Sequence, residues 1–183
     1  MRKNYQKKSF GTCGKILLVS FAILFMAAAV QAESYQTLYP CLINLSGWTG
    51  GEPTGMNMNM SGMVMVNATR TYSMGNKELT AMIMKSNQAA GGGMQQGPGM
   101  QGSGMHMDTP EANMNIQTIN GFQVQTVYDK KESSGAVTVF LTHEEAEGAF
   151  FTLSYAGISE SEALGLAKKF DWERIKNKVE SVK

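Results

Sequence analysis

The stretch of residues 63–85 constrains the fold more than any other, because hydrophobic and polar side chains alternate along it in two runs. Successive side chains of a β-strand point to opposite faces of the sheet, so this pattern predicts two strands with one buried face. Gly75-Asn76 lies between the runs and suits a two-residue hairpin turn. With that turn, Tyr72 lies opposite Leu79.

The predicted hairpin separates two kinds of side chain. One face carries aliphatic and aromatic residues, which are Val64, Val66, Ala68, Tyr72, Leu79, Ala81 and Ile83. The other face carries polar residues together with methionines, which are Met63, Met65, Asn67, Thr69, Thr71, Glu78, Thr80, Met82 and Met84. The methionines therefore share the polar face, and Met65 becomes a diagonal neighbour of Met84 within about 8 Å.

Methionine is concentrated in residues 56–114, which hold 13 methionines in 59 positions. Thioether sulfur is a soft, neutral donor that suits Cu(I), and a few thioethers can converge on one ion. The candidate ligands are methionines of the hairpin and of the segments on either side of it, with one histidine: Met56, Met58, Met60, Met63, Met65, Met82, Met84, Met105, His106 and Met107. A bend at Ser61-Gly62 is needed to gather the first sulfurs, and glycine permits one.

These segments resemble the methionine-rich tracts of periplasmic copper-resistance proteins and multicopper oxidases, in which such tracts collect Cu(I). The resemblance covers residues 56–107 and rests on Met56-x-Met58-x-Met60 and Met105-His106-Met107. It implies Cu(I) as the ligand of this chain.

Methionine also has structural uses that need no metal. It fills irregular gaps in apolar cores because it is unbranched and polarizable, so the methionine face could pack under a helix or form a plastic surface for a partner. For Met94, Met100, Met105 and Met107, drift of a low-complexity loop and sacrificial oxidation to the sulfoxide are further alternatives.

Residues 1–32 predict a signal peptide, because five basic residues precede an apolar run and Val30-Gln31-Ala32 offers small residues at the cleavage positions. The run, from Ile16 to Val30, is shorter than the ~20 residues that a membrane span needs. We therefore expect an exported, periplasmic or secreted, protein without a membrane span in its mature chain. Retention of the leader as an amino-terminal anchor is the alternative. Residues 33–183 then form a single domain.

The charge balance bears on the class of partner. Removal of the leader takes five of the 16 basic residues and none of the 15 acidic ones, which leaves a net charge of 11 − 15 = −4. Nucleic acid binding depends on basic residues that neutralise phosphates, so we expect no nucleic acid partner. The sequence also lacks a recognised nucleophile motif, a P-loop and a dinucleotide fingerprint, so we expect no catalytic activity.

Cys41 is the only cysteine after the leader, so an intramolecular disulfide is excluded in the mature chain. Free cysteine is among the most buried residue types, which favours a buried thiol. An intermolecular disulfide and a metal thiolate are the alternatives.

The remaining segments predict the rest of the fold. Residues 87–113 are rich in glycine without apolar periodicity, which predicts a long disordered loop that interrupts the domain. Alternation then predicts four strands, at 115–119, 122–128, 136–141 and 149–155. Ser159 with Glu162 predicts a capping box, and Asp171 predicts the cap of a final helix. Together these elements predict an α+β fold, with an antiparallel sheet of five or six strands and helices packed on one face.

The order of elements resembles that of PsbP-like exported domains and of uncharacterised secreted bacterial proteins. The resemblance rests on Gly47-Trp48, Arg70-Thr71-Tyr72 and Tyr128-Asp129-Lys130. It implies a fold and carries no chemistry.

The sequence thus predicts an exported, non-catalytic protein whose clustered thioethers bind or buffer Cu(I), with a metal ion or an exported protein as its partner. The alternative is an interaction domain for a protein or ligand, with a methionine-rich surface and no metal.

Overall fold

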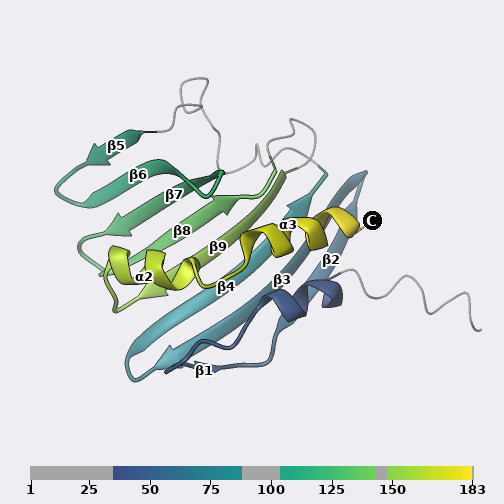
Figure 1. Ribbon diagram of the computed structural model, residues 1–183, viewed down its shortest axis with the longest axis horizontal. Helices are drawn as coiled ribbons and strands as arrows, with labels where there is room; N and C mark the ends of the chain where they lie inside the picture. The colour runs from purple at the N-terminus through teal and green to yellow at the C-terminus, as the bar shows by residue number, and fades with distance from the viewer. Residues whose placement is uncertain (1–34, 88–103, 143–147, 183) are drawn as a thin grey trace, which may run out of the picture. The chain divides into compact units, whose positions relative to one another are not determined.

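Nine β-strands form an antiparallel sheet in the part of the chain that the computed structural model describes, which is residues 35–87, 104–142 and 148–182 (Figure 1). The strands are β1 (Thr49–Gly50), β2 (Thr54–Met60), β3 (Met63–Met74), β4 (Lys77–Ser86), β5 (Met105–Asp108), β6 (Ala112–Ile119), β7 (Phe122–Asp129), β8 (Ser134–Phe140) and β9 (Gly148–Ala156). Their order across the sheet is β1-β3-β4-β9-β8-β7-β6-β5, and β2 also pairs with β3. All of these strands belong to one compact unit, Ser34–Lys183.

The predicted α+β class with five or six strands is wrong, because nine strands dominate the described residues and the helices are short. The helices are η1 (Gln36–Cys41, a 3₁₀ helix), α2 (Glu160–Ala167) and α3 (Trp172–Ser181). The unforeseen strands are β1, β2 and β5, at or near the edges of the sheet. Edge strands bury little, so they need no aliphatic alternation, which is the pattern that marks a half-buried strand.

The hairpin of β3 and β4 has the predicted register. Tyr72 pairs with Leu79 and Ala68 pairs with Ile83, and Gly75 opens the two-residue turn with a φ of +63°. The aliphatic face is buried, as expected, through Val66, Ala68, Tyr72, Leu79, Ala81 and Ile83. The four strands predicted after residue 114 are also confirmed, as β6 to β9.

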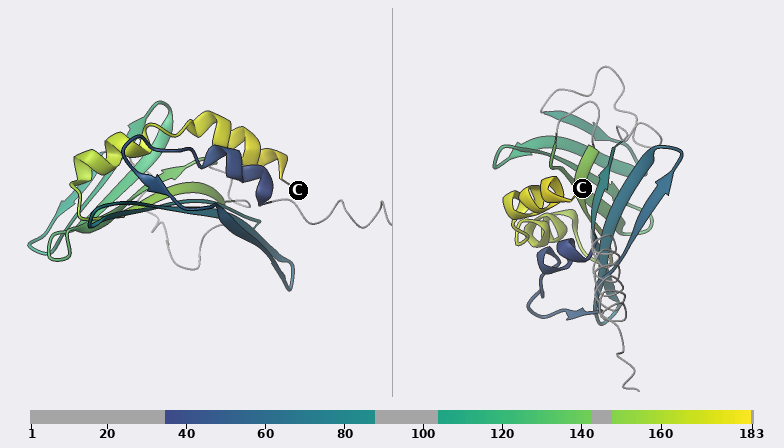
Figure 2. Two further views of the ribbon diagram at one scale, coloured as in Figure 1. Left: turned by 90° about the horizontal axis from the view of Figure 1, so that it is seen from below. Right: turned by 90° about the vertical axis from the view of Figure 1, so that its right-hand side faces the viewer.

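The helices η1, α2 and α3 lie on the same face of the sheet (Figures 1 and 2). We call it the helix-covered face. Phe151 of β9 packs against Phe170 beside α3, with ring centroids 4.7 Å apart, and the buried Ile175 and Val179 lie on α3 itself. The main core therefore lies between this face and the helices.

Local sequence signals set the ends of the helices. The Ser159 hydroxyl accepts a hydrogen bond of 3.2 Å from the Glu162 amide, and the Asp171 carboxylate accepts one of 2.9 Å from the Arg174 amide. Both predicted N-cap hydrogen bonds are thus confirmed, and the Glu162 carboxylate accepts from Lys77 at 3.4 Å. At the other end of α3, Lys85 donates to the Val182 carbonyl at 2.8 Å, which places a cation at a helix carboxyl end.

Arg70 lies in β3 and is hydrogen-bonded to residues that follow η1 and β1. Its guanidinium donates to the carbonyl oxygens of Leu42 and Gly51 and to the side-chain oxygen of Asn44, at 2.7, 2.8 and 2.7 Å. It also lies over the Tyr72 ring, 5.3 Å from the centroid. Arg70 therefore fits on the helix-covered face in the observed β3–β4 register, because its guanidinium extends past the core to backbone acceptors.

Part of the predicted loop at residues 87–113 is regular structure, because β5 and the start of β6 lie within it. Residues 88–103 of that loop, with Met94 and Met100, and the predicted leader at 1–32 lie outside the described residues.

Candidate metal site on the open face of the sheet

The face of the sheet opposite the helices, here called the open face, has no described helix on it (Figure 2). Directly paired residues lie on the same face of a sheet, so the register identifies its members. One row across it is Met84, Phe150, Phe140 and Gln123, on β4, β9, β8 and β7. These side chains are half-buried, whereas those of the helix-covered face are buried.

Seven of the predicted ligands share the open face at the β2 to β4 end of the sheet. We call them the β2–β4 methionine group: Met56, Met58, Met60, Met63, Met65, Met82 and Met84. Within this group, Met58 pairs directly with Met65 and Met60 pairs directly with Met63, across the β2–β3 hairpin. Direct partners have Cβ atoms about 5 Å apart, which is within the reach of two long thioether side chains.

The other members of the group surround these pairs. Met56 and Met84 lie on either side of Asn67, so the three residues form one row across β2, β3 and β4. Met65 is diagonal to Met84, as predicted, at roughly 7–8 Å between backbones. Met82 is one step further along β4, opposite Thr69. Met58 and Met65 are thus the members with the most thioether neighbours.

Exposure divides the group. Met56 and Met60 are 48% and 59% exposed, whereas Met58, Met63, Met65, Met82 and Met84 are half-buried. The members of the β2–β4 methionine group are therefore neither buried under a described helix nor fully exposed to solvent. No described helix covers the open face on which they lie.

The turn between β2 and β3 creates the pairs. Ser61 and Gly62 have φ values of +50° and +87°, which is the left-handed conformation of a type I′ hairpin turn. This is the bend that the metal hypothesis requires, and it occurs as a regular hairpin. The sequence signal that could have revealed β2 is the strict Met-Asn alternation of residues 56–60 next to this turn.

The ligands predicted near residue 106 do not join this group. Five strands, β4, β9, β8, β7 and β6, separate β3 from β5. At ~4.8 Å per strand the two strands are roughly 30 Å apart along the sheet. Met105 and Met107 lie on the open face, with Met107 directly opposite Met114. His106 pairs with Asn115 on the opposite face, so its imidazole points away from the two flanking thioethers.

Met114 was missing from the predicted ligands and completes a second, smaller set, Met105, Met107 and Met114, here called the β5–β6 methionine group. The Gln125 amide donates a hydrogen bond of 3.2 Å to the Met114 sulfur. The spacing of Met114 and Ile116, two residues apart in a strand, predicts that they share a face, and their pairing with Met107 and Met105 shows that it is the open face.

Borderline or hard metals have no comparable site in the described ranges. Across residues 35–87, 104–142 and 148–182, no three His, Cys, Asp or Glu side chains converge as a metal site would require. Cys41 is 3% exposed in the core at the end of η1, and burial raises the pKa of its thiol. The buried alternative for Cys41 is thus confirmed, and the thiol lies apart from the thioethers on the open face.

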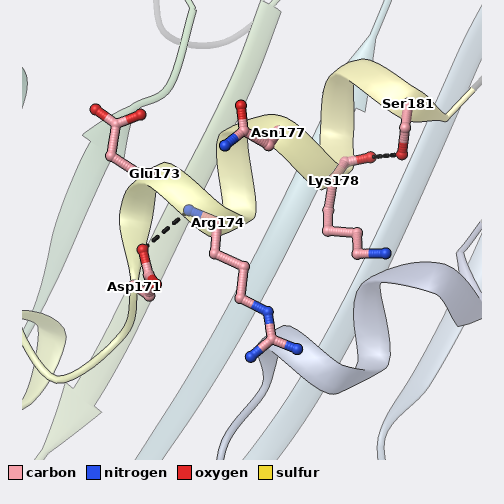
Figure 3. A pocket seen from close by; sticks show the side chains of 6 residues that line it. All are labelled: Asp171, Glu173, Arg174, Asn177, Lys178 and Ser181. Carbon is pink, nitrogen blue, oxygen red and sulfur yellow. Dashed lines mark hydrogen bonds between the residues drawn. The ribbon is translucent and has the colours of Figure 1, made fainter.

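A hollow of about 520 Å³ lies on α3, lined by Asp171, Glu173, Arg174, Asn177, Lys178 and Ser181 (Figure 3). Arg174 and Lys178 point toward η1. Asp171 already caps α3, and the Ser181 hydroxyl donates to the Lys178 carbonyl at 2.7 Å. Two of the six side chains thus serve the helix itself, and the hollow gathers no catalytic set.

Comparison with known proteins adds no assignment. No protein-family model, curated protein or solved structure matches this chain. None of the described helices has both the length and the apolar character needed to cross a membrane.

Proposed function

We propose that this protein binds Cu(I) through the β2–β4 methionine group and acts in buffering or delivery of that ion. The observation that carries the proposal is the direct pairing of Met58 with Met65 on the open face, next to the pair Met60 and Met63. Neighbouring thioethers on an accessible surface are a donor set that selects soft, monovalent copper over harder ions.

The surroundings of the paired sulfurs support the same chemistry. Met84 lies diagonal to Met65, and Asn67 separates Met84 from Met56. The neighbours are neutral, so a bound cation would gain its energy from sulfur coordination and would meet no fixed positive charge in this row. We place this activity in the periplasmic or secreted compartment that the leader predicts.

A second candidate function is an interaction surface without metal. It is favoured by Phe140 and Phe150, a directly paired and half-buried couple in the middle of the open face, and by Val127, which is 37% exposed. Methionine and aromatic side chains together make an adaptable apolar surface for a protein partner.

Competition against a Cu(I) chelator tests the proposed function. The double variant Met58→Leu/Met65→Leu keeps apolar bulk and removes two sulfurs, and we expect its Cu(I) affinity to fall by at least about tenfold. Met74→Leu is the matched control, because Met74 lies in β3 beside Gly47, away from the open face.

Three outcomes separate the two functions. Weaker binding by the double variant with unchanged binding by Met74→Leu supports the proposal. Unchanged binding by both variants removes the hairpin as the site. If the unaltered protein takes no Cu(I) from the competitor, the metal function is wrong and the interaction surface becomes the better explanation.

A further inference from the structure

The outer edge of β2 has backbone groups that no described strand pairs with. The Val64 amide donates to the Asn87 side chain at 2.7 Å, and the Val64 carbonyl accepts from the Asn87 amide at 3.1 Å, so both Val64 groups point away from β2. Asn59 is the partner of Val64 in β2. In an antiparallel pair, the amide and carbonyl of Asn59 therefore also point outward, away from β3.

The outward direction repeats every second residue along β2. Asn57 and Gly55 thus share the orientation of Asn59, while Met56, Met58 and Met60 bond inward to β3. Within the described residues, β2 pairs with β3 alone. Among the described strands, none pairs with this row of backbone donors and acceptors.

The β2 strand also lacks the sequence features that keep sheet edges apart. Residues 54–60 contain no charged residue and no proline. Exposed edges usually carry lysine, proline, a bulge or a cover, because an unprotected edge pairs with another strand. The opposite edge of the sheet, β5, is only four residues long and ends in Asp108, which is bonded to Lys130.

The sequence of β2 is complementary to itself in the antiparallel direction. A two-fold axis at Asn57 places Asn57 opposite its counterpart and Asn59 opposite Gly55, so that all three outward residues form hydrogen bonds. The same register places Met56 directly opposite Met58 of the second copy, in a pair without mutual hydrogen bonds, for which the Cα atoms are only ~4.5 Å apart. No charged side chains meet in this arrangement.

We propose that two copies of this chain pair through β2 and that the Cu(I) site is shared between them. The joined open faces bring together Met56 and Met58 from each copy, with Met65 directly beside Met58 in each. A single chain offers the direct pair Met58 and Met65, whereas the pair of chains surrounds one ion with thioethers from both sides. This inference rests on the proposed Cu(I) function and names its second ligand source, which is another copy of the protein.

Sedimentation of the purified protein with and without Ag(I), a redox-stable substitute for Cu(I), tests the inference. We expect Ag(I) to shift the protein from monomer to dimer. Asn57→Lys places two lysines opposite each other at the two-fold axis, so it should keep the protein monomeric. A monomer offers thioethers from one copy only, so the affinity gained from having both copies around one ion is lost. Ag(I) affinity should therefore fall by on the order of a hundredfold. Asn177→Lys adds the same charge at an exposed position on α3 and should behave like the unaltered protein.

The outcomes separate this inference from the function on which it rests. Loss of both dimer and tight binding in Asn57→Lys, with neither lost in Asn177→Lys, supports the shared site. Tight binding by a monomer, unchanged in Asn57→Lys, overturns the shared site and leaves the Cu(I) function standing. Failure of the unaltered protein to bind Ag(I) or Cu(I) overturns the function and the shared site together. Circular dichroism of Asn57→Lys establishes that the variant still folds, and Asn59→Lys repeats the test at a second outward residue.

Discussion

The Arg70 guanidinium donates a hydrogen bond of 2.7 Å to the carbonyl oxygen of Leu42, just past the end of η1. This bond joins the residue that follows η1 to β3, 28 residues away along the chain. The same guanidinium satisfies Gly51 and Asn44. A single side chain thus holds three segments of the chain in place.

Replacement of Arg70 should therefore cost stability. We expect Arg70→Met to lower the free energy of unfolding by about 1–3 kcal/mol, because the partly buried Leu42 carbonyl loses its charged donor. Urea denaturation measures the change. Arg70→Lys should lose less, since an ammonium group can still donate but cannot reproduce the planar fork. Equal stability of Arg70→Met and the unaltered protein would contradict this role.

Trp172 offers a second stability test. Its indole nitrogen donates to the Ala167 carbonyl at 2.9 Å, and its ring lies edge-on to Phe122 at 5.9 Å. Trp172→Phe removes this hydrogen bond, although the Ala167 carbonyl still accepts one from the Phe170 amide at 3.2 Å, so the free energy of unfolding should fall by about 0.5–1.5 kcal/mol. Trp48→Phe is the control, because Trp48 is only half-buried and should cost less. Similar losses in the two variants would argue against the hydrogen bond as the cause.

The Cys41 thiol should react slowly with a thiol reagent while the protein is folded. It is 3% exposed, and burial raises its pKa, so both access and the thiolate fraction are reduced. The labelling rate should rise with urea in parallel with unfolding. The experiment uses Cys13→Ser, which leaves Cys41 as the single thiol. Immediate labelling under native conditions would show that the core at η1 is open.

Asp108 should titrate below the ordinary range of a carboxyl group. The hydrogen bond from Lys130 is the main cause of its lowered pKa, and the charge of Lys130 adds to it. A lowered carboxyl pKa stabilises the folded state above the unfolded pKa, and this contribution is lost as pH falls through the folded pKa. NMR titration should show the Asp108 pKa rising toward 3.8 in Lys130→Met.

The neighbouring ion pair supplies the control for that titration. Lys131 bonds to Glu111 and not to Asp108, so Lys131→Met should leave the Asp108 pKa unchanged. An unchanged Asp108 pKa in Lys130→Met would show that β5 is not held by this pair.

Cu(I) binding should be nearly independent of pH between roughly pH 7 and pH 5, because thioethers take up no proton there while imidazoles usually do. His106 lies on the face of β5 opposite its flanking methionines, so His106→Ala should leave the affinity unchanged. Chelator competition at both pH values measures this. A steep loss of affinity at the lower pH would indicate an imidazole ligand and contradict a site made of sulfur alone.

Several features of the fold were predictable because their causes are local. The alternation around Gly75-Asn76 was enough to set the β3–β4 register, since a tight turn leaves one pairing that buries the aliphatic face. The caps at Ser159 and Asp171 were equally predictable, because each cap needs only a side-chain oxygen within three residues of a free amide.

The strand count and the division of the ligands were not predictable in this way. β2 and β5 lack aliphatic alternation, and β5 lies in a segment whose composition resembles a loop. Met105 and Met107 could therefore be assigned to the same site as Met65 from sequence, although five strands separate β3 from β5.

The sequence by itself determined which side chains alternate, where the chain turns, and that sulfur and aliphatic groups occupy opposite faces of the central hairpin. Only the tertiary structure decided that β9 lies beside β4, that β1, β2 and β5 lie at the edges of the sheet, and that Met58 is paired with Met65 while Met107 lies on a distant strand. The physical reason is that side-chain periodicity specifies a face of a strand, whereas the neighbours of that strand are chosen by hydrogen bonds and packing between segments distant in the chain.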